Sequence, residues 1–279
     1  MSARVHSSLR RLGLALMTFG ALTLVWAIVV WRWEDPFTAL YTMYEQHGLS
    51  QAYDRRVSQF KATAPKLVSP TRAASRTANR VLAARLRLET EERAIAAAAR
   101  RYRLASREGD PLGRIIVPRL GLNMIFLDGT SEWSLAKGPG RDLQTFMPGE
   151  GRLVYIAGHR TTFLAPFANI NALRPGDTIR LELPYATFVY SVTRHIIVVY
   201  NDMAVLRPGT SELLALQACH PRFFATHRYI VYARPMKVIP SPSLGLPYTL
   251  KLGQPSLLSA SAAEAQGTTR STPQGAVRG

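Results

Sequence analysis

The segment ELLALQACHPRFFATHRYIVYARP, residues 212–235, decides the fold of this chain. It holds two apolar runs, ELLALQAC and RYIVYARP, separated by the eight residues HPRFFATH. Apolar runs of this length that flank a short loop are typical of two neighbouring β-strands. The segment therefore predicts an antiparallel hairpin, in which the end of the first strand faces the start of the second.

Five further apolar runs lie between Pro111 and Pro240, and Gly- and Pro-containing turns separate them. They read GRIIVPRL, LNMIFLDG, RLVYIAGH, DTIRLEL and TFVYSVTRHIIVVY. Seven or eight strands in about 130 residues leave little room for crossover helices, which argues against a doubly wound sheet. We predict a mainly β fold, a small closed β-barrel over residues 110–240.

The N-terminal part contains a candidate membrane span. Residues 12–31 read LGLALMTFGALTLVWAIVVW and carry no charge. A helix of this length crosses about 30 Å of hydrocarbon. Arginines precede the span and Glu34 and Asp35 follow it, so the positive-inside rule places residues 1–11 in the cytoplasm and the rest outside. A cleaved signal peptide is the alternative, but the run exceeds a usual signal core and no small-x-small cleavage site follows.

Residues 32–109 are predicted to form a helical, basic stalk or linker. Residues 55–107 hold twelve Arg and two Lys against three Glu, which is most of the chain's net charge of +17. No Gly or Pro occurs from Thr71 to Glu108, which favours a helix there. Its apolar residues recur in a narrow seam: Val81, Ala84, Leu88, Ile95, Ala98, Tyr102 and Ala105. The seam predicts docking onto the chain's own domain or, alternatively, self-association.

Composition excludes several classes of protein. With 47% hydrophobic residues and 19% charged ones, the chain as a whole is not a disordered protein. A single cysteine excludes a disulfide scaffold and a thiolate zinc cluster. Nucleic acid is not an expected partner, because the basic segment lies beyond the membrane and lacks an aromatic stacking pattern. Residues 241–279 are small, polar and aperiodic, and we expect a disordered tail.

The lone thiol, Cys219, ends the first strand of the hairpin, and Arg228 begins the second. The hairpin should therefore set a guanidinium beside a thiol at a barrel rim, where loops carry function. A neighbouring cation favours the thiolate, which is the reactive form. The alternative is that Cys219 is a buried apolar filler.

A nucleophilic cysteine needs a partner that accepts and donates protons. His220 and His227 adjoin Cys219 and Arg228, so strand alternation should point both away from the site. His195 lies in mid-strand, while the two remaining N-terminal histidines lie in the cytoplasmic and membrane-proximal segments. His159 follows the run RLVYIAG after a glycine and should reach a rim. Its alternative role is a hydrogen bond within a loop.

Taken together, residues from about 110 to 237 resemble the sortases, membrane-anchored cysteine transpeptidases of bacterial surfaces, and most resemble class E. The matching segments are GRIIVPRLGL, the GPG at 138–140, VYIAGHRTTFLAPFANINALRPGD and LQACHPRFFATHRYIVYA. The resemblance implies a catalytic triad of His159, Cys219 and Arg228. The family usually has Thr-Leu-x-Thr-Cys at the nucleophile, whereas this chain has Ala215 and Ala218 at the two threonine positions.

The resemblance also implies the reaction and its partners. The enzyme would cleave an LPxTG-like or LAxTG-like sorting motif of surface proteins, hold the acyl group as a thioester, and transfer it to an amine of a cell-wall precursor or a pilin lysine. No cofactor and no metal are expected, and the site should face the outside of the membrane. The loop NDMAVLRPGT, residues 201–210, is a candidate part of the substrate groove or a plain connector. The alternative function is a non-catalytic, membrane-tethered β-domain that binds anionic surface polymers.

Overall fold

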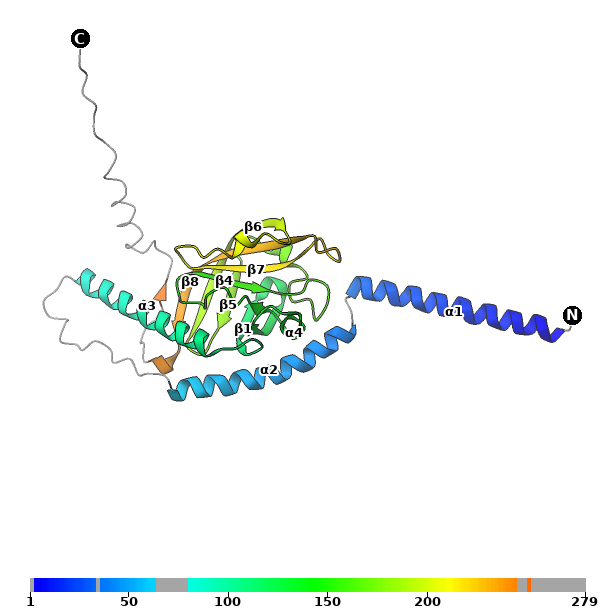
Figure 1. The fold of residues 1–279 in the computed structure, drawn as a ribbon, viewed down its shortest axis with the longest axis horizontal. Coiled ribbons are helices and arrows are strands. Elements are labelled where there is room, and N and C mark those ends of the chain that lie inside the picture. Colours follow the sequence, from blue (N-terminus) through cyan, green and yellow to red (C-terminus); the bar gives the residue numbers. More distant parts are fainter. Residues whose placement is uncertain (1–2, 34–35, 64–79, 245–249, 252–279) are drawn as a thin grey trace, which may run out of the picture.

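The computed structural model describes residues 3–33, 36–63, 80–244 and 250–251. Three long helices precede a β-barrel, and a short helix connects two of its strands (Figure 1). The helices are α1 (Ala3–Trp33), α2 (Pro36–Thr63), α3 (Arg80–Ala105) and α4 (Glu132–Leu135), and the strands are β1 (Pro111–Val117), β2 (Leu122–Asp128), β3 (Gly140–Arg141), β4 (Leu153–Ala157), β5 (Thr178–Glu182), β6 (Ala186–Val199), β7 (Leu213–His220), β8 (His227–Pro240) and β9 (Leu250–Lys251).

The strands form a closed barrel in the order β6-β5-β1-β2-β3-β4-β7-β8, and antiparallel pairing of β6 with β8 closes it. The predicted closed barrel of seven or eight strands is confirmed, and all seven predicted runs contain a strand. The eighth strand, β3, has two residues, too few for an alternating pattern to show in the sequence. Strand β9 adds to the free edge of β8.

The C-terminal segment differs in part from the expected disordered tail. A 3₁₀ turn, η5 (Pro242–Leu244), follows β8, and its Leu244 is buried in the barrel core. β9 pairs Leu250 with Val238. The expectation of disorder is wrong at these positions, because Leu244 packs in the core and β9 finds backbone partners on β8. Residues 245–249 and 252–279 lie outside the described residues.

Alternation along the strands creates two apolar clusters. The interior cluster fills the barrel and includes Leu214, Leu216 and Ala218 from β7. The exterior cluster lies on the other face of β4, β7 and β8 and consists of Leu153, Tyr155, Ala215, Ile230 and Tyr232. Because successive side chains of a strand point to opposite faces, these two sets show which face any residue of these three strands occupies.

Helix α1 carries the predicted membrane span. Within it, Ser8–Val29 has a mean hydropathy of 2.2 and none of the span is buried against the rest of the protein. It is the one helix among the described residues that is long and apolar enough to cross a membrane. It extends away from the barrel (Figure 1), as a membrane anchor would.

Helix α2 packs along the barrel through polar side chains. The Gln46 amide donates to Ile125 O and Lys137 O at 2.9 and 2.8 Å and accepts from Ile125 N at 2.7 Å. Thr42 Oγ1 donates to Ala136 O at 2.8 Å. A Cβ on Gly138 would lie 2.5 Å from Gln46 Nε2, so glycine is required for this close approach. The segment 32–109 is therefore not a free stalk, because α2 is hydrogen-bonded to the barrel.

Helix α3 docks as well. Ile95, Ala98 and Tyr102 of the predicted seam are buried in the interior cluster, and Tyr102 Oη donates to Leu112 O at 2.9 Å. Docking onto the chain's own domain, rather than self-association, thus accounts for the C-terminal half of the seam. Leu88 and Ala105 are exposed, and residues 71–79 and the side chains of Val81 and Ala84 lie outside the description.

Asp128 and Arg141 form an ion pair inside the protein. Arg141 Nε donates to Asp128 Oδ1 at 2.9 Å, and both side chains are 2% exposed. Asp128→Asn removes the negative charge and leaves the guanidinium buried, so we expect a loss of about 3–5 kcal/mol in the free energy of unfolding. Denaturant unfolding of the detergent-solubilised chain measures it.

A matched control for this prediction is Glu89→Gln. Glu89 pairs across one helical turn with Arg93 at 3.7 Å, and the Arg93 side chain is 81% exposed. The Glu89 side chain is 21% exposed, and breaking a pair across one helical turn that has one exposed partner should change the unfolding free energy by about 0.5 kcal/mol. Equal effects of the two substitutions would contradict the assignment of Asp128 and Arg141 as a buried structural pair.

Candidate active site

The β7–β8 hairpin brings Cys219 and Arg228 together. The two residues are direct partners in the antiparallel register of β7 and β8, as the spacing in the sequence predicts. Cys219 is a free cysteine of intermediate exposure. Cys219 is therefore not fully buried in the core, and the residue opposite it on the neighbouring strand carries a guanidinium.

His159 reaches the same row from the other side of β7. Strands β4 and β7 are parallel, with Ala157 paired to Gln217, and Gly158 N donates to Gln217 O at 3.0 Å. His159 and Cys219 each lie two residues beyond that pair. Adjacent strands are roughly 4.8 Å apart, so the register places the backbones of His159 and Cys219 side by side. The three candidate residues thus come from three successive strand ends.

Cys219 and Arg228 occupy the exterior face of the barrel. On β7, Cys219 is on the same face as Ala215. On β8, Arg228 is on the same face as Ile230 and Tyr232. Ala215, Ile230 and Tyr232 belong to the exterior cluster. The 3₁₀ turn η4 (Met203–Leu206), within the candidate groove loop, packs Val205 and Leu206 against this cluster. The loop after β6 therefore borders the face that carries the thiol.

The imidazole of His159 is partly enclosed. Its Nε2 is buried and has no hydrogen-bond partner within the described part of the chain, and its ring centroid lies 5.0 Å from that of Phe163. Burial lowers the pKa of His159 below its usual value of 6.5, against a smaller opposing effect of the Glu132 charge. A proton on this ring is thus less stable than in water.

Phe163 connects His159 to helix α2. Its amide donates to Thr38 Oγ1 at 3.0 Å, and its ring makes an edge contact with Tyr41 at 6.4 Å. Phe163, Leu164 and Ala165 all have positive φ values of 53°, 59° and 34°. Three successive non-glycine residues in this region are strained and need support from their surroundings. Contact with α2 supplies part of that support.

We predict that Phe163→Ala raises the pKa of His159 toward its usual value, because removing the ring lets water solvate the imidazolium. The variant should therefore hold a proton on His159 up to a higher pH than the wild type does. NMR titration of ¹³C-labelled histidine, with His159→Gln used to assign the signal, measures the shift. Phe224→Ala is the control, because Phe224 is 77% exposed. An unchanged midpoint in Phe163→Ala would contradict the role of the ring.

The guanidinium of Arg228 is anchored at one end. Nη1 donates to Ala225 O at 2.8 Å and to His227 O at 3.1 Å, and the guanidinium carbon lies 5.9 Å from the centre of the Tyr200 ring. Nε and Nη2 have no hydrogen-bond partner among the residues that the structure describes. These donors are available to a negatively charged or carbonyl oxygen.

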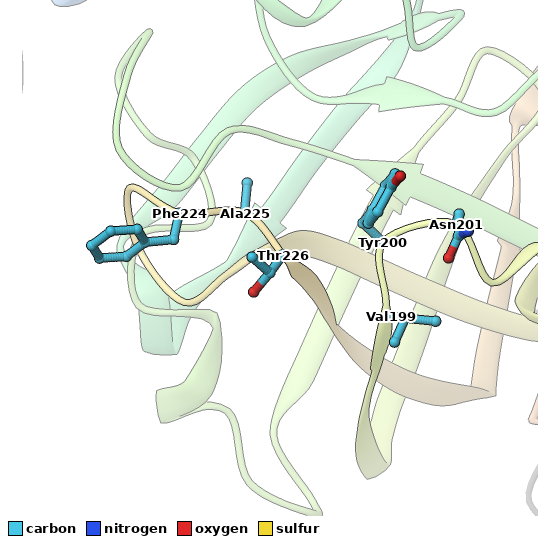
Figure 2. A pocket seen from close by; sticks show the side chains of 6 residues that line it. All are labelled: Val199, Tyr200, Asn201, Phe224, Ala225 and Thr226. Carbon is cyan, nitrogen blue, oxygen red and sulfur yellow. The ribbon is translucent and has the colours of Figure 1, made fainter.

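A pocket of about 460 Å³ is lined in part by Tyr200, the ring over which the Arg228 guanidinium lies. It lies between the end of β6 and the β7–β8 loop, where Tyr200 N donates to Thr226 O at 3.2 Å. Figure 2 shows Tyr200 and Ala225 on its two sides, with the ring of Phe224 directed outward. It is lined by Val199, Tyr200, Asn201, Phe224, Ala225 and Thr226.

Arg160 is a residue of the site that the sequence analysis missed. Its Nη1 donates to Cys219 O at 3.0 Å and lies 2.9 Å from His220 Nδ1, while Nη2 donates to Asn171 Oδ1 at 2.9 Å. Arg160 therefore ties the end of β7 to the loop after β4, which fixes the strand ends that carry Cys219 and His159. Its position directly after His159 was the available signal.

The other histidines of the barrel have different partners. The His220 ring lies beside Arg160 and 6.0 Å from the Tyr229 ring. His195 stacks on Tyr229 at 5.1 Å, and His227 Nδ1 lies 2.9 Å from Thr226 Oγ1. None of these contacts involves the Cys219 side chain.

The two positions where the resemblance leads one to expect threonine are fully buried. Ala218 lies in the interior cluster, on the opposite face from Cys219, and Ala215 lies in the exterior cluster. Ala215 is four residues from Cys219, roughly 13 Å along the strand. Alanine suits both apolar surroundings, since a hydroxyl there would need a partner.

Comparisons with known proteins match the barrel region to one protein family. The family model for the Sortase domain matches residues 115–236. Sortase D from Bacillus subtilis (strain 168) is 29% identical over 130 residues, 45% of this chain and 64% of that protein. Sortase SrtE1 from Streptomyces coelicolor is 34% identical over 88 residues, 28% of this chain and 25% of that protein. The matched region thus spans less than two thirds of each of these two relatives.

Among solved structures, sortase E from Streptomyces avermitilis is 31% identical, and the match covers 48% of this chain and 93% of that one with a TM-score of 0.43. The residues matched by the family model, 115–236, include all three candidate residues.

Proposed function

Because the chain belongs to the sortase family, we propose that it is a membrane-anchored cysteine transpeptidase with Cys219 as nucleophile, His159 as acid and base, and Arg228 as oxyanion or substrate donor. The observation that carries the proposal is the position of these residues at the ends of three adjacent strands: His159 follows β4 by two residues, Cys219 lies near the end of β7, and Arg228 lies near the start of β8. The match to Sortase SrtE1 and to a sortase E structure favours class E.

The proposed reaction begins with attack of the Cys219 thiolate on a peptide carbonyl carbon. The C–N bond breaks, His159 gives its proton to the leaving amine, and a thioester holds the freed acyl group. The free Nε and Nη2 donors of Arg228 stabilise the negative oxygen of the tetrahedral intermediate. A second amine then loses a proton to His159 and attacks the thioester, and the C–S bond breaks to regenerate the Cys219 thiolate and the protonated His159.

The proposed substrates are surface proteins with an LPxTG-like or LAxTG-like sorting motif, and the proposed acceptor is an amine of a cell-wall precursor or a pilin lysine. The α1 helix supports anchoring in the membrane, and the charges on either side of the span favour a cytoplasmic N-terminus and an extracytoplasmic barrel. The loop with η4 packs on the cluster that shares a face with Cys219, and the pocket includes Tyr200, beside the Arg228 guanidinium; both positions support them as parts of the substrate groove.

Thiol labelling tests this proposal against an inert domain that binds polymers. Since Cys219 is the chain's one cysteine, a maleimide or iodoacetamide reports on it alone. An enzymatic thiol should react in the native state with a pH profile that shifts in His159→Ala. His195→Ala is the matched control, because His195 stacks on Tyr229. Labelling that requires denaturant, or one profile shared by all three proteins, would contradict the proposal.

A further inference from the structure

The beginning of helix α2 has two different faces. One face packs on the barrel through Thr38, Thr42 and Gln46. The opposite face presents four large apolar side chains, which we call the α2 apolar face: Phe37, Leu40, Met43 and Tyr44, at 72, 67, 59 and 78% exposure. Apolar surface gathered in this way is a mark of an interaction site.

The apolar character of this surface ends after two turns of the helix. Further along, α2 still packs inward, with Tyr53 and Phe60 buried, so its contact with the barrel continues. From Gln51 to Gln59 its exposed residues are polar: Gln51, Asp54, Arg55, Ser58 and Gln59. Whatever covers the α2 apolar face therefore contacts only the part of α2 nearest to α1.

The neighbours of the α2 apolar face indicate what covers it. α1 ends at Trp33 and α2 begins at Pro36, and the ring of Phe37 lies 5.7 Å from that of Trp26 in α1. The α2 apolar face is therefore continuous with the exposed apolar span Ser8–Val29. Aromatic side chains are enriched at the water interface of a bilayer, and helices with one apolar face lie there with that face in the lipid.

We infer that the α2 apolar face lies in the interfacial zone of the bilayer that α1 spans. The inference rests on the proposed membrane anchoring. It extends that function, because Thr38 on the opposite face bonds the amide of Phe163, next to His159. The loop that carries His159 then lies about one helix diameter, roughly 10 Å, from the lipid surface. The enzyme would act on sorting motifs presented close to the membrane.

Spin labels at single cysteines test the location of this surface. In a Cys219→Ala background no native thiol remains, so Leu40→Cys and Tyr44→Cys can be labelled in the full chain. The chain is placed in vesicles of phosphatidylcholine and phosphatidylglycerol. The controls are Leu16→Cys within α1 and Ser58→Cys on the polar part of α2, both at exposed positions. Collisions with oxygen report lipid, and collisions with a nickel chelate report water.

We expect the labels at positions 40 and 44 to collide more with oxygen than the label at 58 and to approach the value at 16. Water-exposed values at 40 and 44, matching those at 58, would overturn the inference. Immobile labels shielded from both reagents, with spin–spin broadening, would show that a second copy covers the face instead, and would overturn it too.

A second measurement tests the functional consequence. The double variant Leu40→Glu with Tyr44→Glu should lose turnover of a vesicle-anchored sorting peptide several-fold while keeping turnover of the same peptide free in solution. Gln51→Glu is the matched control. Equal turnover of the anchored peptide by the double variant and the wild type would overturn the close approach of the site to the bilayer. Absence of turnover in the wild type would instead contradict the proposed function, and the spin-label result would stand.

Discussion

Replacing Cys219 by alanine should abolish the thioester and lower transpeptidation at least about 10³-fold, the largest effect that we expect from any single substitution. The proposed reaction has no other thiol, because the chain holds one cysteine. Mass spectrometry of the protein after incubation with a sorting-motif peptide, with and without an amine acceptor, measures both steps. A covalent acyl adduct should form on the wild type and be absent from Cys219→Ala.

The fold should survive this substitution. Cys219 is only partly buried, so the loss of one sulfur creates no large cavity, and the melting curve should change little. Leu216→Ala is the contrasting control, because Leu216 is fully buried in the interior cluster and should cost about 2–5 kcal/mol of stability. Turnover by folded Cys219→Ala equal to that of the wild type would end the enzymatic proposal.

Arg228→Lys should lose most of the activity although the charge is kept, with kcat falling by about 10²–10³-fold. The physical reason is that different nitrogens of the guanidinium bind different groups. Nη1 is used by Ala225 O and His227 O, while Nε and Nη2 remain for the substrate oxygen. A lysine ammonium is a single point and cannot reach both positions. Steady-state kinetics with a sorting-motif peptide measures the loss.

The matched control is Arg234→Lys, an exposed position further along β8, which should keep normal kinetics. Native labelling of Cys219 should persist in Arg228→Lys, since the thiol itself is unchanged. If Arg228→Lys turns over substrate at the wild-type rate, the arginine does not act in the site.

The hairpin part of the site could be predicted from the sequence because its information is local. Two apolar runs with a short loop have few ways to pair, and the expected pairing of Cys219 with Arg228 is the one observed. The place of His159 is different, because β4 and β7 are parallel neighbours separated by 55 residues of chain, Gly158–Glu212. Nothing local fixes that pairing, and elimination of other histidines and a family resemblance pointed to it.

The docking of α2 could not be predicted for another reason. In the first half of α2 the contacts are made by Thr42 and Gln46, whose partners are backbone groups of the barrel. Polar residues on a helix normally indicate a solvated face, and a backbone acceptor has no signature in the sequence. The sequence of α2 therefore suggests a linker, although the helix packs on the barrel.

A cluster of three aromatic side chains joins α2 and α3 to the barrel and limits how far the N-terminal part can be truncated. Phe60 of α2 and Tyr102 of α3 lie 6.1 Å apart, and each lies near Tyr185 of the barrel, at 6.2 and 5.8 Å. Cutting the chain at residue 110 would strip two of these rings away and open the hydrophobic interior to water. Fragments for crystallisation or enzymology should therefore keep Phe60 of α2 and Tyr102 of α3, since shorter ones would expose the interior cluster.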